Sequence, residues 1–267
     1  MGRRNSAVEI KQETVRLVIE RGSSPSRATQ RGRNESPAKP APKMTPIPRA
    51  LSRETLQQGA WVLAARDSDL GRLVRTLGEP PMWGRRPGFA TIIRIVLEQQ
   101  VSLQAARTMF RRLQSRLGHV TPRAVHGLQV AGLRELGLTR QKADYCHGIA
   151  ARVLAGSLDL RAVARASDAA GRSMLLSVPG LGPWSVDVYY LMALRRPDVW
   201  PQGDLALAVA LREVKRLRAL PSQAEQQAFA DGWAPWRSVA ARILWAHYLS
   251  ARGRGPNAGR SPRSGQD

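Results

Sequence analysis

Apolar residues recur at helical spacing through most of the middle of the chain. Leu56 and Leu63 follow Ser52 at positions that share one helix face, which predicts a helix beginning after that serine. A longer apolar stripe of the same period runs from Phe89 to Leu117. No segment keeps a period of two residues. The pattern therefore predicts an all-α fold of roughly ten short helices.

Short polar turns, many with Gly or Pro, separate these segments and supply helix-start signals. Thr121 precedes Pro122, the order expected for an N-cap followed by the first helical residue. Thr139 predicts another helix start in the same way. Further helices are expected to begin near residues 171, 183, 204, 222 and 236.

The chain of 267 residues carries 42 Lys and Arg against 20 Asp and Glu, a net charge of +22. Residues 1–49 hold +7 and residues 252–267 hold +3, and both segments are rich in Ser, Pro, Gly and Arg. Such segments bury too little apolar surface to offset ordering entropy, which predicts disordered basic tails over 1–49 and 253–267. The predicted helical domain, 50–252, is itself basic, with +12 on residues 50–251. A polyanionic partner is therefore expected, either nucleic acid or an anionic membrane surface.

Composition also excludes several classes of protein. The single cysteine, Cys146, excludes a disulfide scaffold, a zinc ribbon and a four-cysteine iron–sulfur cluster. No run of eighteen apolar residues is present, and the first twenty residues lack the apolar stretch of a secretion signal. A membrane-spanning or secreted protein is therefore not expected.

One turn carries a more specific pattern than helix packing requires. Residues 178–183 read Val-Pro-Gly-Leu-Gly-Pro between two apolar helical segments. Its two glycines let the backbone approach a partner closely, and the free N–H groups of the turn and helix start can hold an anion. This order is the helix–hairpin–helix pattern that grips a DNA phosphate without reading base sequence; an ordinary turn is the alternative. The predicted phosphate-binding residues are Pro179, Gly180, Leu181, Gly182 and Pro183.

The stretch 177–187, followed by 199–207 with its Gly203-Asp204 pair, resembles the helix–hairpin–helix/Gly-Pro-Asp superfamily of base-excision DNA glycosylases. Within it, the resemblance is strongest to the DNA-3-methyladenine glycosylase II branch. Three more segments agree in order: 97–102, 137–143, and 233–238 with Trp245. The likeness spans about residues 50–250.

The resemblance implies a two-lobed helical fold. The hairpin lobe would cover about residues 90–195, and the second lobe would combine 50–89 with 196–250. Longer bacterial members of the family carry an additional N-terminal α/β domain. Since only about 50 residues precede the predicted helices here, that domain is expected to be missing.

The resemblance implies that Asp204 is the catalytic residue of a glycosylase acting on alkylated purines of the 3-methyladenine and 7-methylguanine type. Breaking an N-glycosidic bond passes through an oxocarbenium-like state that a nearby carboxylate stabilises. Asp204 follows a glycine and precedes an apolar run, so a plain N-cap role remains the alternative from the residues alone.

A second implication concerns strand cleavage. Bifunctional members place a nucleophilic Lys two residues after the second hairpin glycine, and this chain has Trp184 there, with no Lys between Lys142 and Lys215. A monofunctional enzyme that uses water as nucleophile, without lyase activity, is therefore expected.

The family's pocket and wedge positions carry over to a few residues. Trp184, Trp245 and Tyr189 are expected to form an aromatic base pocket that attracts an electron-poor alkylated purine. Gln100, and its neighbour Gln99, match the wedge that enters the duplex where the base is flipped out. A polar helix end without such a role is the alternative.

No required cofactor and no iron–sulfur cluster are expected. The resemblance implies a structural Na⁺ or K⁺ at the hairpin, held by the backbone carbonyls of Leu176, Val178 and Leu181. The expected partner is damaged double-stranded DNA rather than a membrane, and the expected protein is a cytoplasmic monomer, associated with the nucleoid if bacterial.

Three alternatives to this function stay open. One is a related glycosylase with another lesion specificity. Another is a non-catalytic helix–hairpin–helix DNA-binding protein, which would need neither Asp204 nor the tryptophans. A third is membrane-surface binding by the basic N-terminal tail.

Overall fold

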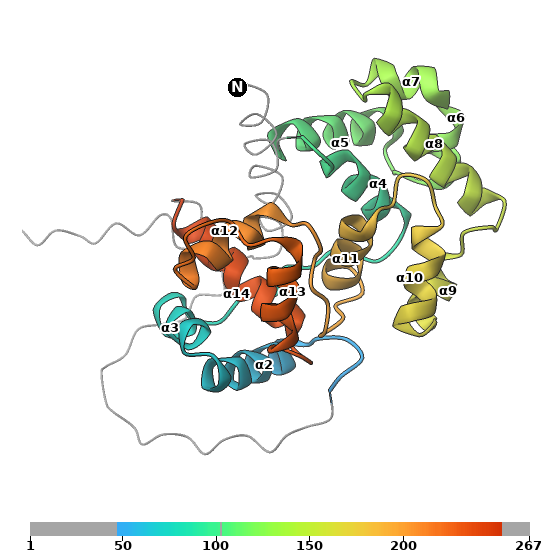
Figure 1. Cartoon of the computed structure of the whole chain (residues 1–267). Helices are drawn as coiled ribbons and strands as arrows, with labels where there is room; N and C mark the ends of the chain where they lie inside the picture. The colour runs from blue at the N-terminus through green and yellow to red at the C-terminus, as the bar shows by residue number, and fades with distance from the viewer. Residues whose placement is uncertain (1–46, 102, 253–267) are drawn as a thin grey trace, which may run out of the picture.

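The computed structural model describes residues 47–101 and 103–252, so the predicted tails lie almost entirely outside the described residues (Figure 1). Within the described residues every regular element is a helix, which confirms the all-α prediction. With the labels of Figure 1, the helices are α2 (Arg53–Arg66), α3 (Ser68–Leu77), α4 (Phe89–Glu98), α5 (Leu103–Leu117), α6 (Pro122–Gly127), α7 (Gln129–Glu135), α8 (Arg140–Leu154), α9 (Leu160–Arg165), α10 (Asp168–Leu176), α11 (Pro183–Met192), α12 (Leu205–Val214), α13 (Gln223–Asp231) and α14 (Arg237–Ser250).

Most helix starts follow from local side-chain chemistry. Ser52, Thr121 and Thr139 cap α2, α6 and α8 through their hydroxyl oxygens, as predicted. Helix α10 starts at Asp168 rather than near residue 171, because Ser167 supplies its N-cap.

The continuous stripe predicted from Phe89 to Leu117 is divided in the structure. Helix α4 ends at Glu98, and Gln100 takes a left-handed backbone conformation with φ +53° before α5 begins. The side chain of Lys142, on α8, donates a hydrogen bond to the carbonyl of Leu97 at the end of α4. A tertiary contact thus satisfies a carbonyl that a continuing helix would have used.

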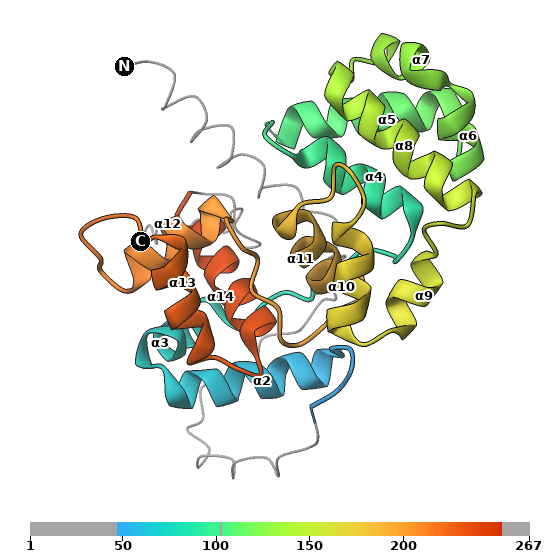
Figure 2. The same cartoon turned by 45° about the vertical axis from the view of Figure 1, so that its right-hand side comes forward.

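The helices form two groups, which the two views in Figures 1 and 2 separate clearly. Helices α4 to α11 pack together, with α8 covering α4, α6 and α7. Helices α2, α3, α12 and α13 surround α14. Helices α11 and α14 are buried on nearly all sides, and apart from a few polar residues such as Asp187 and Arg242 their buried positions are apolar.

Arg242 of α14 ties the two groups together. Its guanidinium is completely buried and donates to the carbonyls of Trp83, at 2.6 Å, and Leu191, at 3.0 Å, the latter near the end of α11. Burial lowers the pKa of Arg242 to about 9, so the group stays charged at neutral pH. Backbone carbonyls accept hydrogen bonds from both terminal nitrogens of Arg242, whereas its buried Nε has no hydrogen-bond partner among the described residues.

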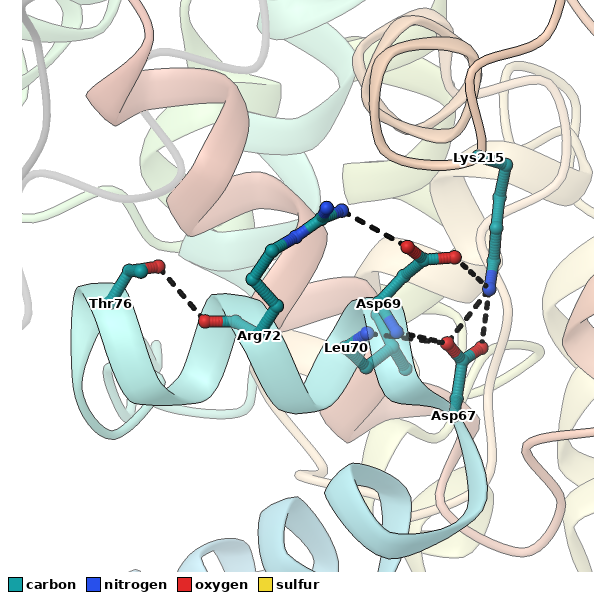
Figure 3. Close-up of polar contacts among 6 residues, drawn as sticks. All are labelled: Asp67, Asp69, Leu70, Arg72, Thr76 and Lys215. Carbon is teal, nitrogen blue, oxygen red and sulfur yellow. Dashed lines mark hydrogen bonds and ion pairs between the residues drawn. The ribbon is translucent and has the colours of Figure 1, made fainter.

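A second polar connection joins α3 to the end of α12 (Figure 3). The ammonium of Lys215 donates to Asp67 at 2.7 Å and to Asp69 at 3.0 Å, and Arg72 pairs with Asp69 at 3.0 Å. Burial alone would raise the pKa of Asp67, but hydrogen bonds from Lys215 and Trp233 outweigh it and lower that pKa. Asp67 also caps α3, so one carboxylate orients both elements.

No helix among the described residues is long and apolar enough to cross a membrane.

Candidate active site

The hairpin between α10 and α11 has the geometry that its sequence predicted. Leu181 donates its N–H to the carbonyl of Val178 at 3.0 Å, which closes the turn. Gly180 adopts φ +93°, and Pro183 occupies the first turn of α11 after the N-cap Gly182. The N-terminal N–H groups of α11 are therefore available at this end of the helix.

Gly180 cannot be replaced without strain. A Cβ at this position would lie 2.5 Å from Cγ of the Tyr145 ring, in addition to requiring an unfavourable positive φ. We expect Gly180→Ala to lower the free energy of unfolding by about 1–3 kcal/mol and to weaken DNA binding, as measured by urea denaturation and by titration with duplex DNA. Gly148→Ala, within α8, is the matched control, because its Cβ meets no atom within 4 Å. A Gly180→Ala protein as stable as the control would contradict this assignment.

A cavity of about 830 Å³ opens beside the hairpin. Its wall joins the end of α4, the start of α8, the hairpin and the start of α12, and this volume lies in the range of ligand pockets. The lining residues are Glu98, Gln99, Gln100, Val101, Thr139, Gln141, Lys142, Tyr145, residues 176–185, Gly203, Asp204 and Leu205. The hairpin residues and Asp204 thus face one cavity.

Asp204 places a buried carboxylate at this wall. Asp204 is the N-cap of α12, and its side-chain Oδ1 accepts the N–H of Leu207 at 3.0 Å. Oδ1 also accepts the indole N–H of Trp245 at 3.3 Å, and Oδ2 accepts that of Trp184 at 3.0 Å. Burial raises the pKa of Asp204, although these donors act in the opposite direction. The N-cap role and a chemical role are therefore compatible, since the hydrogen-bond partners of this carboxylate, Trp184, Leu207 and Trp245, are all uncharged.

The three aromatic residues predicted for the base pocket occupy different positions. Trp184 is half-buried and lines the cavity, so its assignment to a base pocket stays a prediction that this position allows. Trp245 is only 2% exposed and lies behind Asp204, so it holds the carboxylate instead of forming a pocket wall. Tyr189 is fully buried in the core, where its hydroxyl accepts the N–H of Gly88 at 3.1 Å. Its pocket assignment is wrong because α11 turns it toward the centre of the protein.

The two glutamines predicted as a wedge also differ. Gln100 is exposed at the turn after α4 and lines the cavity, a position compatible with a wedge. Gln99 instead donates its side-chain amide to the carbonyl of Gly180 and to the hydroxyl of Ser185, both at 2.8 Å. Gln99 therefore braces the hairpin and is not free to enter the duplex.

Sequence reasoning missed a buried charged cluster at the same wall. Glu98 is 1% exposed and accepts hydrogen bonds from Arg85 at 2.9 Å and Arg94 at 3.2 Å. Burial lowers the pKa of the nearby Lys142 to about 8. The only sequence signal was the position of Glu98 and Lys142 inside two of the family-like segments. Together they hold the end of α4 from which Gln100 projects.

Asp187 has a role that the sequence did not indicate. Its side chain is buried, and the residue is only 1% exposed. It pairs with Arg172 of α10 and accepts the backbone N–H of Gln202 at 2.9 Å. Burial raises the pKa of Asp187. The pair fixes the loop that leads through Gly203, at φ +72°, to Asp204.

The three residues whose carbonyls the resemblance assigns to a monovalent cation, Leu176, Val178 and Leu181, all border the cavity. The Val178 carbonyl already accepts the N–H of Leu181, while the other two carbonyls accept no hydrogen bond within the described region. Uncharged carbonyl oxygens suit a hard alkali-metal ion. No group of three His, Cys, Asp or Glu side chains in the described residues is arranged to hold a metal.

Known proteins are similar to this chain in sequence. DNA-3-methyladenine glycosylase 1 of Schizosaccharomyces pombe is 28% identical over 191 residues, covering 68% of this chain and 83% of that protein. DNA-3-methyladenine glycosylase 2 of Escherichia coli is 24% identical over 176 residues, covering 60% of this chain and 59% of that protein.

Solved structures and the family model agree with those relatives. The structure of the S. pombe 3-methyladenine DNA glycosylase in complex with abasic DNA matches with a TM-score of 0.64 and 26% identity, over 70% of this chain and 95% of that chain. A family model for HhH-GPD superfamily base excision DNA repair proteins matches residues 93–238, a span that includes both the hairpin and Asp204. With more than half of its length covered by that match, the chain belongs to the HhH-GPD superfamily of base excision DNA repair proteins.

Proposed function

We propose that this protein is a DNA glycosylase that flips alkylated purines, of the 3-methyladenine and 7-methylguanine type, out of duplex DNA and hydrolyses their N-glycosidic bond. The observation that carries the proposal is the buried Asp204 carboxylate, which shares one cavity with the phosphate-binding hairpin. The names of the two glycosylase relatives, and the abasic-DNA complex of one structural neighbour, support the same chemistry.

The carboxylate is suited to stabilise positive charge on a sugar. The donors to this carboxylate, two indole N–H groups and the backbone N–H of Leu207, are neutral, so no hydrogen-bonded cation cancels its negative charge. In a site shielded from water such a charge acts strongly on an oxocarbenium-like transition state. The same oxygens orient, or take a proton from, the water that attacks the sugar carbon.

Trp184 would supply selectivity for alkylated bases. Its ring borders the cavity while its indole N–H is held by Asp204. N-alkylated purines carry positive charge, which an indole face attracts through cation–π interaction. Damaged bases also cost less to unstack than paired normal bases, which adds to selectivity.

The absence of a hairpin lysine supports a monofunctional enzyme. Trp184 occupies the position of the lysine nucleophile, and the amine of Lys142, although it borders the cavity, donates to the carbonyl of Leu97. We expect borohydride to trap no covalent complex with DNA that contains the substrate lesion. A trapped complex that disappears in Lys142→Met would overturn the monofunctional assignment and identify the amine responsible.

The function is tested by measuring base release from duplexes that each contain one defined lesion. We expect release of 3-methyladenine and 7-methylguanine and no release of undamaged purines. Release of a different damaged base would indicate a related specificity. Tight binding to abasic-analogue DNA without any base release would indicate a non-catalytic DNA-binding protein.

The proposal also predicts a change in pH dependence. Base release requires ionised Asp204, so activity rises as pH rises through its pKa. Trp184 lowers that pKa by hydrogen bonding, and Trp184→Phe is therefore expected to move the acidic limb of the kcat/KM profile to higher pH. Trp61→Phe, on the exposed side of α2, is the matched control and should leave the profile unchanged. An unshifted Trp184→Phe profile would show that another group controls the acidic limb.

A further inference from the structure

The end of the hairpin lobe formed by α5, α6 and α7 is strongly cationic. Residues 103–140 contain seven arginines and one acidic residue, Glu135. On this surface a shallow groove of about 510 Å³ runs between α5 and the end of α7. We call it the arginine groove, and its residues are Thr108, Arg111, Arg112, Ser115, Arg116 and Leu136.

The cations of the arginine groove lack acidic partners. Within residues 47–101 and 103–252, Arg111, Arg112 and Arg116 form no ion pair and no side-chain hydrogen bond, and all three are exposed. Other arginines of the described chain do have carboxylate partners, as Arg85 has Glu98 and Arg172 has Asp187. Three unpaired guanidinium groups around one groove repel each other electrostatically. An anionic partner that binds between them would offset this repulsion.

The arginine groove lies close to the candidate active site at both of its ends. Leu136 borders the groove and Thr139 borders the cavity, so at most about 11 Å of chain separates them. Helix α5 begins just after Val101, which also lines the cavity. From the start of α5, Arg111 is about 12 Å along the helix axis and Arg116 about 20 Å.

We propose that the arginine groove binds backbone phosphates of the duplex that flanks the lesion, about three to six base pairs away at about 3.4 Å per pair. This inference rests on the proposed glycosylase function. The fork of a guanidinium matches phosphate oxygens, and the hydroxyls of Thr108 and Ser115 add neutral donors to the same groove. This contact would extend the length of duplex that the protein covers, and it would not depend on the base sequence.

The test compares two variants that each lose two positive charges. Arg111→Gln/Arg116→Gln removes cations of the groove, and Arg53→Gln/Arg75→Gln removes exposed cations of α2 and α3, which lie at the opposite end of the molecule (Figure 2). Binding to a 25-base-pair duplex with a central abasic analogue is measured from about 50 to 300 mM salt. We expect the groove variant to reduce the slope of log K against log salt by about 2, and the control to leave it unchanged.

A second measurement locates the contact. The flanking duplex is shortened from about eight to about three base pairs on one side of the abasic analogue and then on the other. Wild type should lose affinity on shortening one side, whereas Arg111→Gln/Arg116→Gln should not. Equal slopes in the two variants, or equal length dependence in wild type and groove variant, would overturn the inference.

Base release separates this inference from the proposed function. With enzyme in saturating excess, the groove variant should excise the lesion at the wild-type rate, since no residue of the groove lines the cavity. If wild type excises bases but the two variants bind alike, only the inference fails. If wild type excises no base, the proposed function fails, and the salt slopes still report whether the groove binds DNA.

Discussion

Asp204→Asn is expected to reduce the single-turnover rate of base release by at least about 10²–10³-fold while leaving the protein folded. Asparagine keeps the size of the side chain and caps helices as well as aspartate does, so α12 retains its N-cap. It lacks the negative charge that opposes positive charge on the sugar. One of its amide hydrogens would face the indole N–H of Trp184 or Trp245, a mismatch that costs about 1–3 kcal/mol of stability.

The accompanying measurements distinguish lost chemistry from lost structure. Affinity for abasic-analogue DNA should stay the same or increase, because one carboxylate fewer faces a polyanion. Asp159→Asn is the matched control, since Asp159 also caps a helix through its side chain but is exposed and distant from the cavity. Wild-type base release by Asp204→Asn would refute the catalytic assignment. Loss of DNA binding together with activity would indicate a structural role instead.

Glu98→Ala is expected to lower the free energy of unfolding by about 3–5 kcal/mol. The substitution leaves the guanidinium of Arg85, 6% exposed, without its carboxylate partner in a buried site. One terminal nitrogen of Arg85 already lacks a hydrogen-bond partner among the described residues, so no spare acceptor is available to replace Glu98. Because Glu98 also ends α4, the turn that carries Gln100 should loosen and base release should fall.

Removing both charges is the informative control for this prediction. Arg85→Met/Glu98→Leu should recover most of the stability lost in Glu98→Ala, because an apolar pair avoids the uncompensated charge. Glu135→Ala, on the exposed surface of α7, should change stability by less than about 0.5 kcal/mol. If the double variant is as unstable as Glu98→Ala, packing rather than the buried charge of Arg85 would explain the loss.

Features that depend on neighbours in sequence were predictable. The helical period, the caps at Thr121 and Thr139, and the turn around Gly180 and Gly182 are local, and the structure confirms each of them. The hairpin pattern is informative for the same reason, since positive φ and a proline at a helix start act within a few residues. The fold class and the family resemblance followed from these local signals and their order.

Features that depend on distant segments were not predictable from periodicity. Trp184 and Tyr189 are aromatic residues of the same helix, and the sequence does not show which of them faces the cavity. The direction of each is set by how α11 packs against its neighbours, and only Trp184 faces the cavity. The division of the stripe after Glu98 likewise depends on Lys142 from α8.

The sequence by itself determined an all-helical, basic protein with a Gly- and Pro-marked hairpin followed by an aspartate at a helix start. Only the tertiary structure decided which groups surround that aspartate. It placed Trp245 behind Asp204, engaged Gln99 with the hairpin, and buried Asp187 against the loop before Asp204. The physical reason is that periodicity marks which residues become buried, whereas the partner of each buried polar group is chosen by long-range packing.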